Sequence, residues 1–235
     1  MIAVTTFGPS GYEKYGRNCL QTLDKHFPGR VIAYYEEKPT DAPERVELRE
    51  FSGIPGATAY LDKIKDMDGD GHKDYRYDAN RFCRKVFAQD AVFDESDRVF
   101  WIDADSVILK PIPSRFLDGL VDGVALAYLG RHTLYTETGF LGFNTKHPDF
   151  TKFRANYLSY FTTGRIFSQM KGWHDCIAFD HARKGVSGRD LNVKREQNHC
   201  LVQSVLGEYI DHLKGPKRKA AGHSKEHPAT WWAKP

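Results

Sequence analysis

The stretch Val99–Pro111, VFWIDADSVILKP, combines a short apolar run with two acidic residues at its end. A continuous apolar run of this length is typical of a central strand buried on both faces of a parallel sheet. The run ends at Asp103, and Asp105 follows two residues later. Ligands of open α/β sheets bind beyond the carboxyl ends of the strands. The stretch therefore predicts a buried strand that brings both aspartates to a ligand-binding edge.

Strand-like and helix-like segments alternate on both sides of this stretch. Before it, we expect strands over 1–7 and 30–37 and helices over 11–27, 57–65 and 78–93. After it, we expect strands over 123–129 and 139–144 and helices over 148–161 and 196–206. The alternation predicts an α/β fold with a mostly parallel central sheet flanked by helices. No internal repeat, low-complexity block or linker divides the 235 residues, so one domain is expected.

The composition excludes several classes of protein. The 34 basic and 31 acidic residues give a formal charge of +3, too small for a general nucleic-acid binder. The amino terminus enters a strand-like run without a signal peptide or transmembrane segment, which predicts a cytoplasmic chain. The four cysteines are widely spaced and form no Cys-x-x-Cys pair, so they are expected to be small core residues. Phosphate-loop, dinucleotide-binding, zinc-protease and nucleophile-elbow motifs are missing from the sequence.

The acidic stretch, with its apolar flanks and the closing KPIP, resembles the Asp-x-Asp region of GT-A glycosyltransferases. Three Asp-x-Asp triplets occur where about 1.7 are expected by chance, so the flanks carry the resemblance and not the triplet. The alternative is a strand-end turn capped by acids. The resemblance implies a single GT-A (Rossmann-like) domain over 1–235, with a nucleotide-binding half at 1–110 and an acceptor and sugar half at 111–235. It also implies that Asp103 and Asp105 bind a metal and that Asp103 contacts the donor.

A second resemblance lies near the carboxyl end. The sequence DHLKGPKRK is similar to the His-x-x-Gly-x-x-Lys element of glycosyltransferase family 8, although Arg218 stands where that family has lysine. The resemblance implies that His212 is a third metal ligand and that Gly215, Lys217 and Arg218 contact the donor diphosphate. The cations of this segment are expected to neutralise the leaving UDP: Lys214, Lys217, Arg218 and Lys219. One imidazole beside two carboxylates suits Mn²⁺ better than Mg²⁺, which remains possible. The alternative is an ordinary solvated basic tail.

Further site residues follow from the same resemblance. Those implied to contact the nucleotide or its phosphates are Thr5, Thr6, Phe7, Tyr12, Glu36, Arg81 and Lys85. Those implied to contact the sugar or acceptor are Glu137, Thr138, Asn144, Trp173 and Asp175. Each has a structural alternative: Arg81 as a solvated helix charge, Trp173 as a core residue and Asp175 as a helix cap.

The resemblance implies transfer of a hexose from a UDP-sugar to an acceptor hydroxyl. Asp175, Glu137 and Lys85 are the expected catalytic residues, and the family-8-like element favours retention of the anomeric configuration. The acceptor is a glycan, a lipid-linked molecule or a small molecule. No nucleic-acid partner is expected, and the oligomeric state is left open.

Two other functions remain open from the sequence. A sugar-phosphate nucleotidylyltransferase shares the α/β plan, but it begins with a glycine-rich basic loop that TTFGPSGYEKYG does not supply. A calcium-binding module is suggested by DMDGDGHKD, Asp66–Asp74, which matches calcium-loop positions one, three, five, six and nine. The twelfth position is Tyr77 instead of glutamate, so a solvated turn is the favoured interpretation of that loop.

Overall fold

The computed structural model describes residues 1–65, 75–193, 197, 198 and 200–224. The segment Asp66–Asp74 lies outside the described residues, so the calcium prediction is not tested by the structure. The main element is a seven-stranded sheet with the strand order β3-β2-β1-β4-β7-β6-β8. Its strands are β1 (Ile2–Phe7), β2 (Arg30–Tyr35), β3 (Val46–Glu50), β4 (Arg98–Ile102), β6 (Leu126–Leu129), β7 (Glu137–Asn144) and β8 (Gly188–Asp190).

One strand of this sheet runs against the others. β1 pairs in parallel with β2 and β4, β2 with β3, and β6 with β8, whereas β7 is antiparallel to both β4 and β6. The prediction of a mostly parallel sheet is therefore confirmed. The reversal of β7 places its first residues, Glu137 and Thr138, at the edge where β4 ends, because Ile102 pairs with Phe140.

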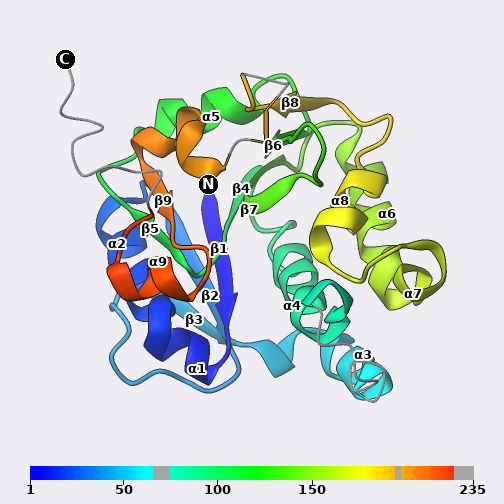
Figure 1. The fold of residues 1–235 in the computed structure, drawn as a ribbon, viewed down its shortest axis with the longest axis horizontal. Coiled ribbons are helices and arrows are strands. Elements are labelled where there is room, and N and C mark those ends of the chain that lie inside the picture. The colour runs from blue at the N-terminus through cyan, green and yellow to red at the C-terminus, as the bar shows by residue number, and fades with distance from the viewer. Residues whose placement is uncertain (66–74, 194–196, 199, 225–235) are drawn as a thin grey trace.

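Helices cover both faces of the sheet (Figure 1). The α-helices are α1 (Pro9–Gly11), α2 (Arg17–His26), α3 (Ala57–Ile64), α4 (Ala79–Asp90), α5 (Ser114–Val121), α6 (Phe150–Thr162), α7 (Arg165–Gln169), α8 (Asp175–Ala182) and α9 (Pro216–Ala221). A π-helix, η1 (Tyr12–Gly16), lies between α1 and α2, and four 3₁₀ helices complete the set: η2 (Phe51–Gly53), η3 (Tyr75–Tyr77), η4 (Leu201–Gln203) and η5 (Val205–Glu208). No described helix has the length and apolar character needed to cross a membrane.

The apolar run of β4 feeds two separate layers of core. Val99 and Trp101 belong to the layer beneath α3, α4, α6 and α8, while Phe100 and Ile102 belong to the layer beneath α2 and α5. Side chains of a strand alternate between faces, so an apolar residue at every position buries both faces. This is the arrangement that the sequence predicts for a central strand.

A second, two-stranded sheet joins distant parts of the chain. β5 (Ser106–Ile108) continues from the acidic turn after β4 and pairs antiparallel with β9 (Ile210–His212). The helix predicted over 196–206 is wrong for the residues described, which form the 3₁₀ turns η4 and η5. Ser204 interrupts the helix because its backbone is extended and its side chain accepts a hydrogen bond from the backbone N–H of Leu206.

Candidate active site

The acidic pair lies where β4 leaves the sheet. The backbone N–H of Asp103 donates to the carbonyl of Gly139 at 2.9 Å, and the N–H of Ser106 donates to the carbonyl of Asp103 at 2.9 Å. These two bonds hold the turn between β4 and β5. The indole N–H of Trp101 donates to Asp103 Oδ1 at 2.6 Å, which fixes the direction of that carboxylate. The turn is thus held by backbone and side-chain bonds before any ligand is considered.

The β5–β9 ladder brings His212 to the same place. Ser106 pairs with His212 in that ladder, so the imidazole arrives beside the residue that follows Asp105. His212 Nε2 lies 3.0 Å from Asp105 Oδ1 and 3.8 Å from Asp103 Oδ2. One ligand atom from each of the three residues lies within 4.8 Å of the others. The predicted metal ligands are therefore brought together, across 107 residues of sequence between Asp105 and His212.

The donor set fits a divalent cation. Two carboxylates and an imidazole are ligands that Mn²⁺ accepts readily, and Mg²⁺ is the harder ion that favours oxygen alone. Burial alone would raise the pKa of Asp105, but bonds and charges from His212 and Lys219 hold it well below its ordinary value. Burial alone would lower the pKa of His212, but the hydrogen bond to Asp105 and nearby carboxylates raise it. Asp105 thus keeps its negative charge and draws cations to this point.

Lys85 on α4 is 7% exposed and bridges two acids. Its Nζ lies 2.9 Å from Asp103 Oδ1 and 2.8 Å from Asp175 Oδ2, and it also donates to the carbonyl of Thr138. Burial alone would lower the pKa of Lys85, but the charges of Asp103 and Asp175 raise it above its ordinary value. An ammonium has three donors, and all three are used here. The resemblance implied that Lys85 contacts the donor nucleotide or its phosphates. In the structure its three donors are taken up by Asp103, Asp175 and Thr138, so Lys85 fixes two carboxylates instead.

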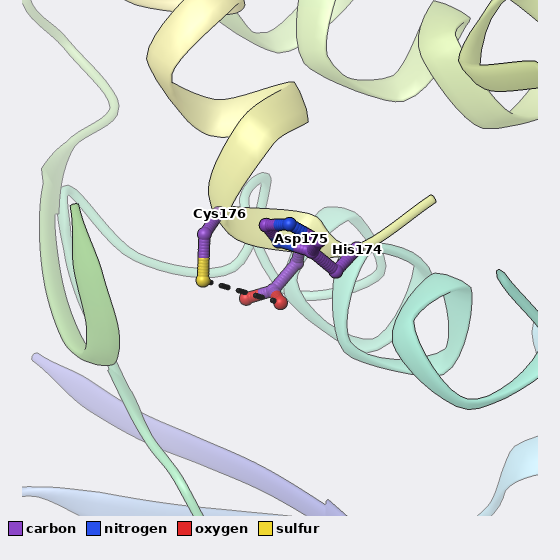
Figure 2. Close-up of side chains that lie close together, drawn as sticks. All are labelled: His174, Asp175 and Cys176. Carbon is purple, nitrogen blue, oxygen red and sulfur yellow. Dashed lines mark hydrogen bonds between the residues drawn. The ribbon is translucent and has the colours of Figure 1, made fainter. Parts of the chain in front are cut away.

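Asp175 begins α8 (Figure 2). It is 1% exposed. Its Oδ2 accepts from the hydroxyl of Thr138 at 2.6 Å as well as from Lys85. Burial alone would raise the pKa of Asp175, but the charge of Lys85 and these hydrogen bonds lower it. A buried carboxylate with this pairing remains ionised.

Glu137 is buried at the start of β7 and carries two cationic partners. Its carboxylate lies 3.2 Å from Arg131 and 3.1 Å from Lys214. Burial alone would raise the pKa of Glu137, but the charges of His212, Lys214 and Arg131 lower it to about 2. Because β7 is reversed, this acid faces the same edge as Asp103.

A cavity of about 1380 Å³ opens over these residues. It is wide enough for a nucleotide and a sugar, since small-molecule sites commonly occupy roughly 300–1,000 Å³. The predicted site residues that line it are Thr6, Phe7, Glu36, Arg81, Lys85, Asp103, Asp105, Glu137, Thr138, Asp175, His212 and Gly215. Most of the predicted site thus converges on one cavity.

Asn144 and Trp173, two residues predicted to contact sugar or acceptor, lie elsewhere. Asn144 is at the far end of β7, where its side chain accepts from Arg98 at 2.6 Å and donates to the carbonyl of Val121. Trp173 is partly buried, packs edge-on against Tyr77 and Phe167 at the side of the core, and is not part of the cavity lining.

Four residues predicted to contact the donor also lie outside the cavity lining. Thr5 is fully buried in β1. Tyr12 packs on Phe7 and donates to Asp41 at 2.7 Å. Lys217 and Arg218 lie on α9. The neighbouring Lys219, on the same helix, does line the cavity, as does Lys214.

Some lining residues are not among the contacts that the resemblance implied, and Lys219 was expected only as one of the cations that neutralise the leaving UDP. Lys219 Nζ lies 2.8 Å from Asp105 Oδ2 and 4.0 Å from the ring centroid of Tyr15. Arg131 comes from the loop before β7, and loop residues give no periodic signal. His174 is 7% exposed between the rings of Phe82 and Tyr135, and burial lowers its pKa. The sequence pointed to His174 only through its place at the predicted start of a helix.

Comparison with known proteins gives a fold and no sequence family. No protein-family model matches the chain, and no curated protein matches its sequence. The apo structure of the WbbM bifunctional glycosyltransferase matches over 86% of this chain and 39% of that chain, with 15% identity and a TM-score of 0.51. Mouse xyloside xylosyltransferase 1 in its apo form matches over 81% and 85% of the two chains, with 9% identity and a TM-score of 0.48. GlyE from Streptococcus pneumoniae TIGR4 matches over 81% and 45%, with 11% identity and a TM-score of 0.49.

The match to WbbM extends over most of this chain, so the two share an architecture. The fold is therefore of the GT-A type that the sequence predicts, and the chain spans 39% of that larger protein. Membership of family 8 stays a prediction.

Proposed function

We propose that this chain is a glycosyltransferase that moves a hexose from a UDP-sugar to the hydroxyl of an acceptor, with a divalent cation, Mn²⁺, at Asp103, Asp105 and His212. The fold is compatible with this activity but does not by itself establish it, because one fold supports many reactions. The observation that carries the proposal is the convergence of two carboxylates and a distant imidazole on the floor of a cavity of about 1380 Å³.

The cation, when bound, would neutralise charge that builds on the diphosphate as the bond to the sugar breaks. Asp103, Asp105 and His212 would hold it. Lys219, now paired with Asp105, and Lys214, now paired with Glu137, lie at the cavity wall as further positive charges for phosphate oxygens. Arg81 lines the same wall, and its guanidinium lies 5.6 Å from the ring centroid of Phe82.

Lys85 serves in this proposal as a positioning residue. It fixes Asp103, which would hold the cation, and Asp175, which would orient the sugar. A fixed geometry of this kind is what rate enhancement through orientation requires. Glu137, held by Arg131 and Lys214, would orient the acceptor.

The proposal includes retention of the anomeric configuration. An inverting transfer needs a base that takes the proton of the acceptor hydroxyl. The lowered pKa of Asp175 and its pairing with Lys85 make it a weak proton acceptor. Nuclear magnetic resonance of the first-formed product would reveal its anomeric configuration, and an inverted product would contradict this part of the proposal.

The direct test is binding of UDP with and without Mn²⁺, measured by thermal shift and calorimetry. We expect Mn²⁺ to tighten UDP binding at least tenfold in the wild type. We expect Asp105→Asn and His212→Gln to remove that gain. Asp97→Asn is the matched control, because Asp97 is an exposed acid beside the opposite end of β4.

Turnover then separates the possible reactions. Release of UDP from a UDP-sugar in the presence of an acceptor panel supports the proposal. Release of pyrophosphate from a nucleoside triphosphate would instead support a nucleotidylyltransferase. UDP binding that is equally tight in wild type and Asp105→Asn, with Mn²⁺ present, would overturn the proposed site.

A further inference from the structure

A second group of potential metal ligands lies in the wall of the same cavity. His174, Asp175 and Cys176 are consecutive, and one ligand atom from each lies within 4.8 Å of the others. All three line the cavity. In Figure 2, the sulfur of Cys176 and the carboxylate of Asp175 project to the same side of the first turn of α8. Within the described part of the chain, this group and the Asp103–Asp105–His212 group are the two of this kind.

The atoms of this second group have coordination capacity that the protein does not use. Lys85 and Thr138 both contact Asp175 Oδ2, whereas the described residues offer Asp175 Oδ1 only the weak thiol donor of Cys176 at 3.7 Å. Cys176 Sγ itself lies 3.0 Å from the hydroxyl of Thr138, a contact that zinc would replace. His174 makes ring contacts with Phe82 and Tyr135, but its ring nitrogens have no hydrogen-bond partner among the described residues. His174 as a whole is 7% exposed and lines the cavity, so its nitrogens are available to a ligand that enters there.

We propose that His174, Asp175 and Cys176 form a second cation site that binds Zn²⁺. Sulfur, imidazole nitrogen and carboxylate oxygen are the ligand types of zinc, and three protein ligands leave a fourth position open to water in the cavity. On binding, the Cys176 thiol releases its proton to solvent, and zinc forms bonds to Cys176 Sγ, an imidazole nitrogen of His174 and Asp175 Oδ1. Lys85 stays on Asp175 Oδ2.

The geometry needs only a small closure. Zinc bonds of about 2.0–2.3 Å place tetrahedral ligands roughly 3.3–3.8 Å apart. The carboxylate and sulfur are already 3.7 Å apart. The imidazole has no hydrogen bond to break, so a change in its side-chain torsions can close the remaining gap. The site contains one cysteine, which is why the absence of a Cys-x-x-Cys pair does not argue against it.

The two cation sites differ in chemistry. The Asp103–Asp105–His212 group has no sulfur and suits a harder ion, while Cys176 adds a soft ligand that selects zinc. A zinc ion here would hold Asp175 and fill the corner of the cavity beside it. If the proposed glycosyltransferase function is correct, zinc then inhibits transfer, and this consequence alone depends on that function.

Titration with Co²⁺ tests the site, because cobalt bound to a thiolate gives an intense charge-transfer band. We expect one equivalent of this band in the wild type and none in Cys176→Ser. Cys200→Ser is the matched control, since Cys200 is also partly exposed but lies outside the cavity lining. His174→Phe keeps the contacts with Phe82 and Tyr135 and removes the ring lone pair, so we expect cobalt affinity to fall at least tenfold. Melting temperatures of the variants show whether each is folded.

The outcomes distinguish this site from the first. Asp105→Asn should keep the cobalt–thiolate band and the competition by Zn²⁺, even if UDP binding is lost or never occurs. A band that disappears in Asp105→Asn, persists in folded Cys176→Ser, or is absent from the wild type would overturn the proposal. In turnover assays, Zn²⁺ should lower the rate of the wild type at least tenfold. The same loss of rate in Cys176→Ser would contradict inhibition through this site.

Discussion

Gly139 shows how one residue makes room for the candidate metal ligand. Its carbonyl accepts from the N–H of Asp103, and the face where a side chain would project is filled by His212. A Cβ at this position would lie 2.6 Å from Cε1 and 2.8 Å from Nδ1 of that imidazole. A real Cβ essentially never comes this close to a non-bonded atom, so any larger residue must move the ring.

We therefore expect Gly139→Ala to displace His212 and weaken Mn²⁺-dependent UDP binding at least tenfold, as measured by calorimetry. Gly53→Ala is the control, because a Cβ there meets nothing within 4 Å. Circular dichroism should show the same secondary structure for both variants. Unchanged Mn²⁺-dependent binding in Gly139→Ala would mean that His212 is not a ligand.

Glu137 predicts a pH dependence of stability. Its pKa is about 2 in the folded protein against an ordinary value of 4.5. A carboxyl with a depressed folded pKa stabilises the protein above the unfolded pKa, and that stabilisation is lost as the pH falls from about 4.5 toward 2. The difference corresponds to about 3 kcal/mol. Urea unfolding of metal-free protein between pH 7 and 3 should show a shallower loss for Glu137→Gln than for wild type, and parallel curves would contradict this assignment.

The acidic pair could be predicted from sequence because its signal is local. An apolar strand followed by Asp103 and Asp105 is visible in a few residues. The ion pairs of Lys85 were not predictable in the same way, because Asp175 is distant in the chain and its approach depends on how α4 and α8 pack. His212 was found only through a family resemblance, since its pairing with β5 is a long-range contact.

Among the secondary-structure elements, the direction of β7 explains why Asn144 lies far from the cavity although it was predicted to contact the sugar or acceptor. The sequence TGFLGFN identifies a strand but not its orientation, and both ends carried predicted site residues. Seven residue steps separate Glu137 from Asn144 along β7, about 23 Å, so the two side chains cannot reach one ligand. The antiparallel pairing with β4 selects the Glu137 end and sends Asn144 to the opposite edge.

The contact between α6 and α4 gives a prediction at the same scale. Arg154 on α6 lies 2.6 Å from Asp90, at the end of α4, and 2.7 Å from Asp94, just beyond it. We expect Arg154→Met to lower the free energy of unfolding by about 1–2 kcal/mol, because two partly exposed pairs are lost together. Urea denaturation measures this difference. Arg115→Met, at an exposed position on α5, should change stability by less than about 0.5 kcal/mol, and an equal loss in both variants would contradict a specific role for Arg154.

The whole molecule is stabilised by two apolar layers separated by the sheet. The layer beneath α4, α6 and α8 is rich in aromatic rings, and Phe153 stands among them with no exposed surface. Its ring centroid lies 5.2 Å from that of Tyr157 and 5.5 Å from that of Phe179. The overall architecture was predictable because the residues that form these layers recur with the spacing of strands and helices. β3 was not predicted, because its sequence VELRE at the sheet edge is mostly charged and has no apolar pattern.

Removal of this ring should be costly for the entire fold. We expect Phe153→Ala to reduce the free energy of unfolding by about 3–5 kcal/mol, because it leaves a cavity among packed rings. Leu134→Ala is the comparison, since Leu134 is 55% exposed and its loss should be nearly neutral. Denaturation midpoints of both variants test this, and a small change for Phe153→Ala would contradict the described packing.

The ladder between β5 and β9 also sets the order in which a growing chain can acquire its parts. All seven strands of the main sheet lie within the first 190 residues, whereas His212 leaves the ribosome 107 residues after Asp105. A nascent polypeptide can therefore hold every strand of that sheet while the acidic turn still lacks its imidazole. The candidate cation site is completed only after β9 has been made, and a product that stops before Ile210 would carry the aspartates without the histidine.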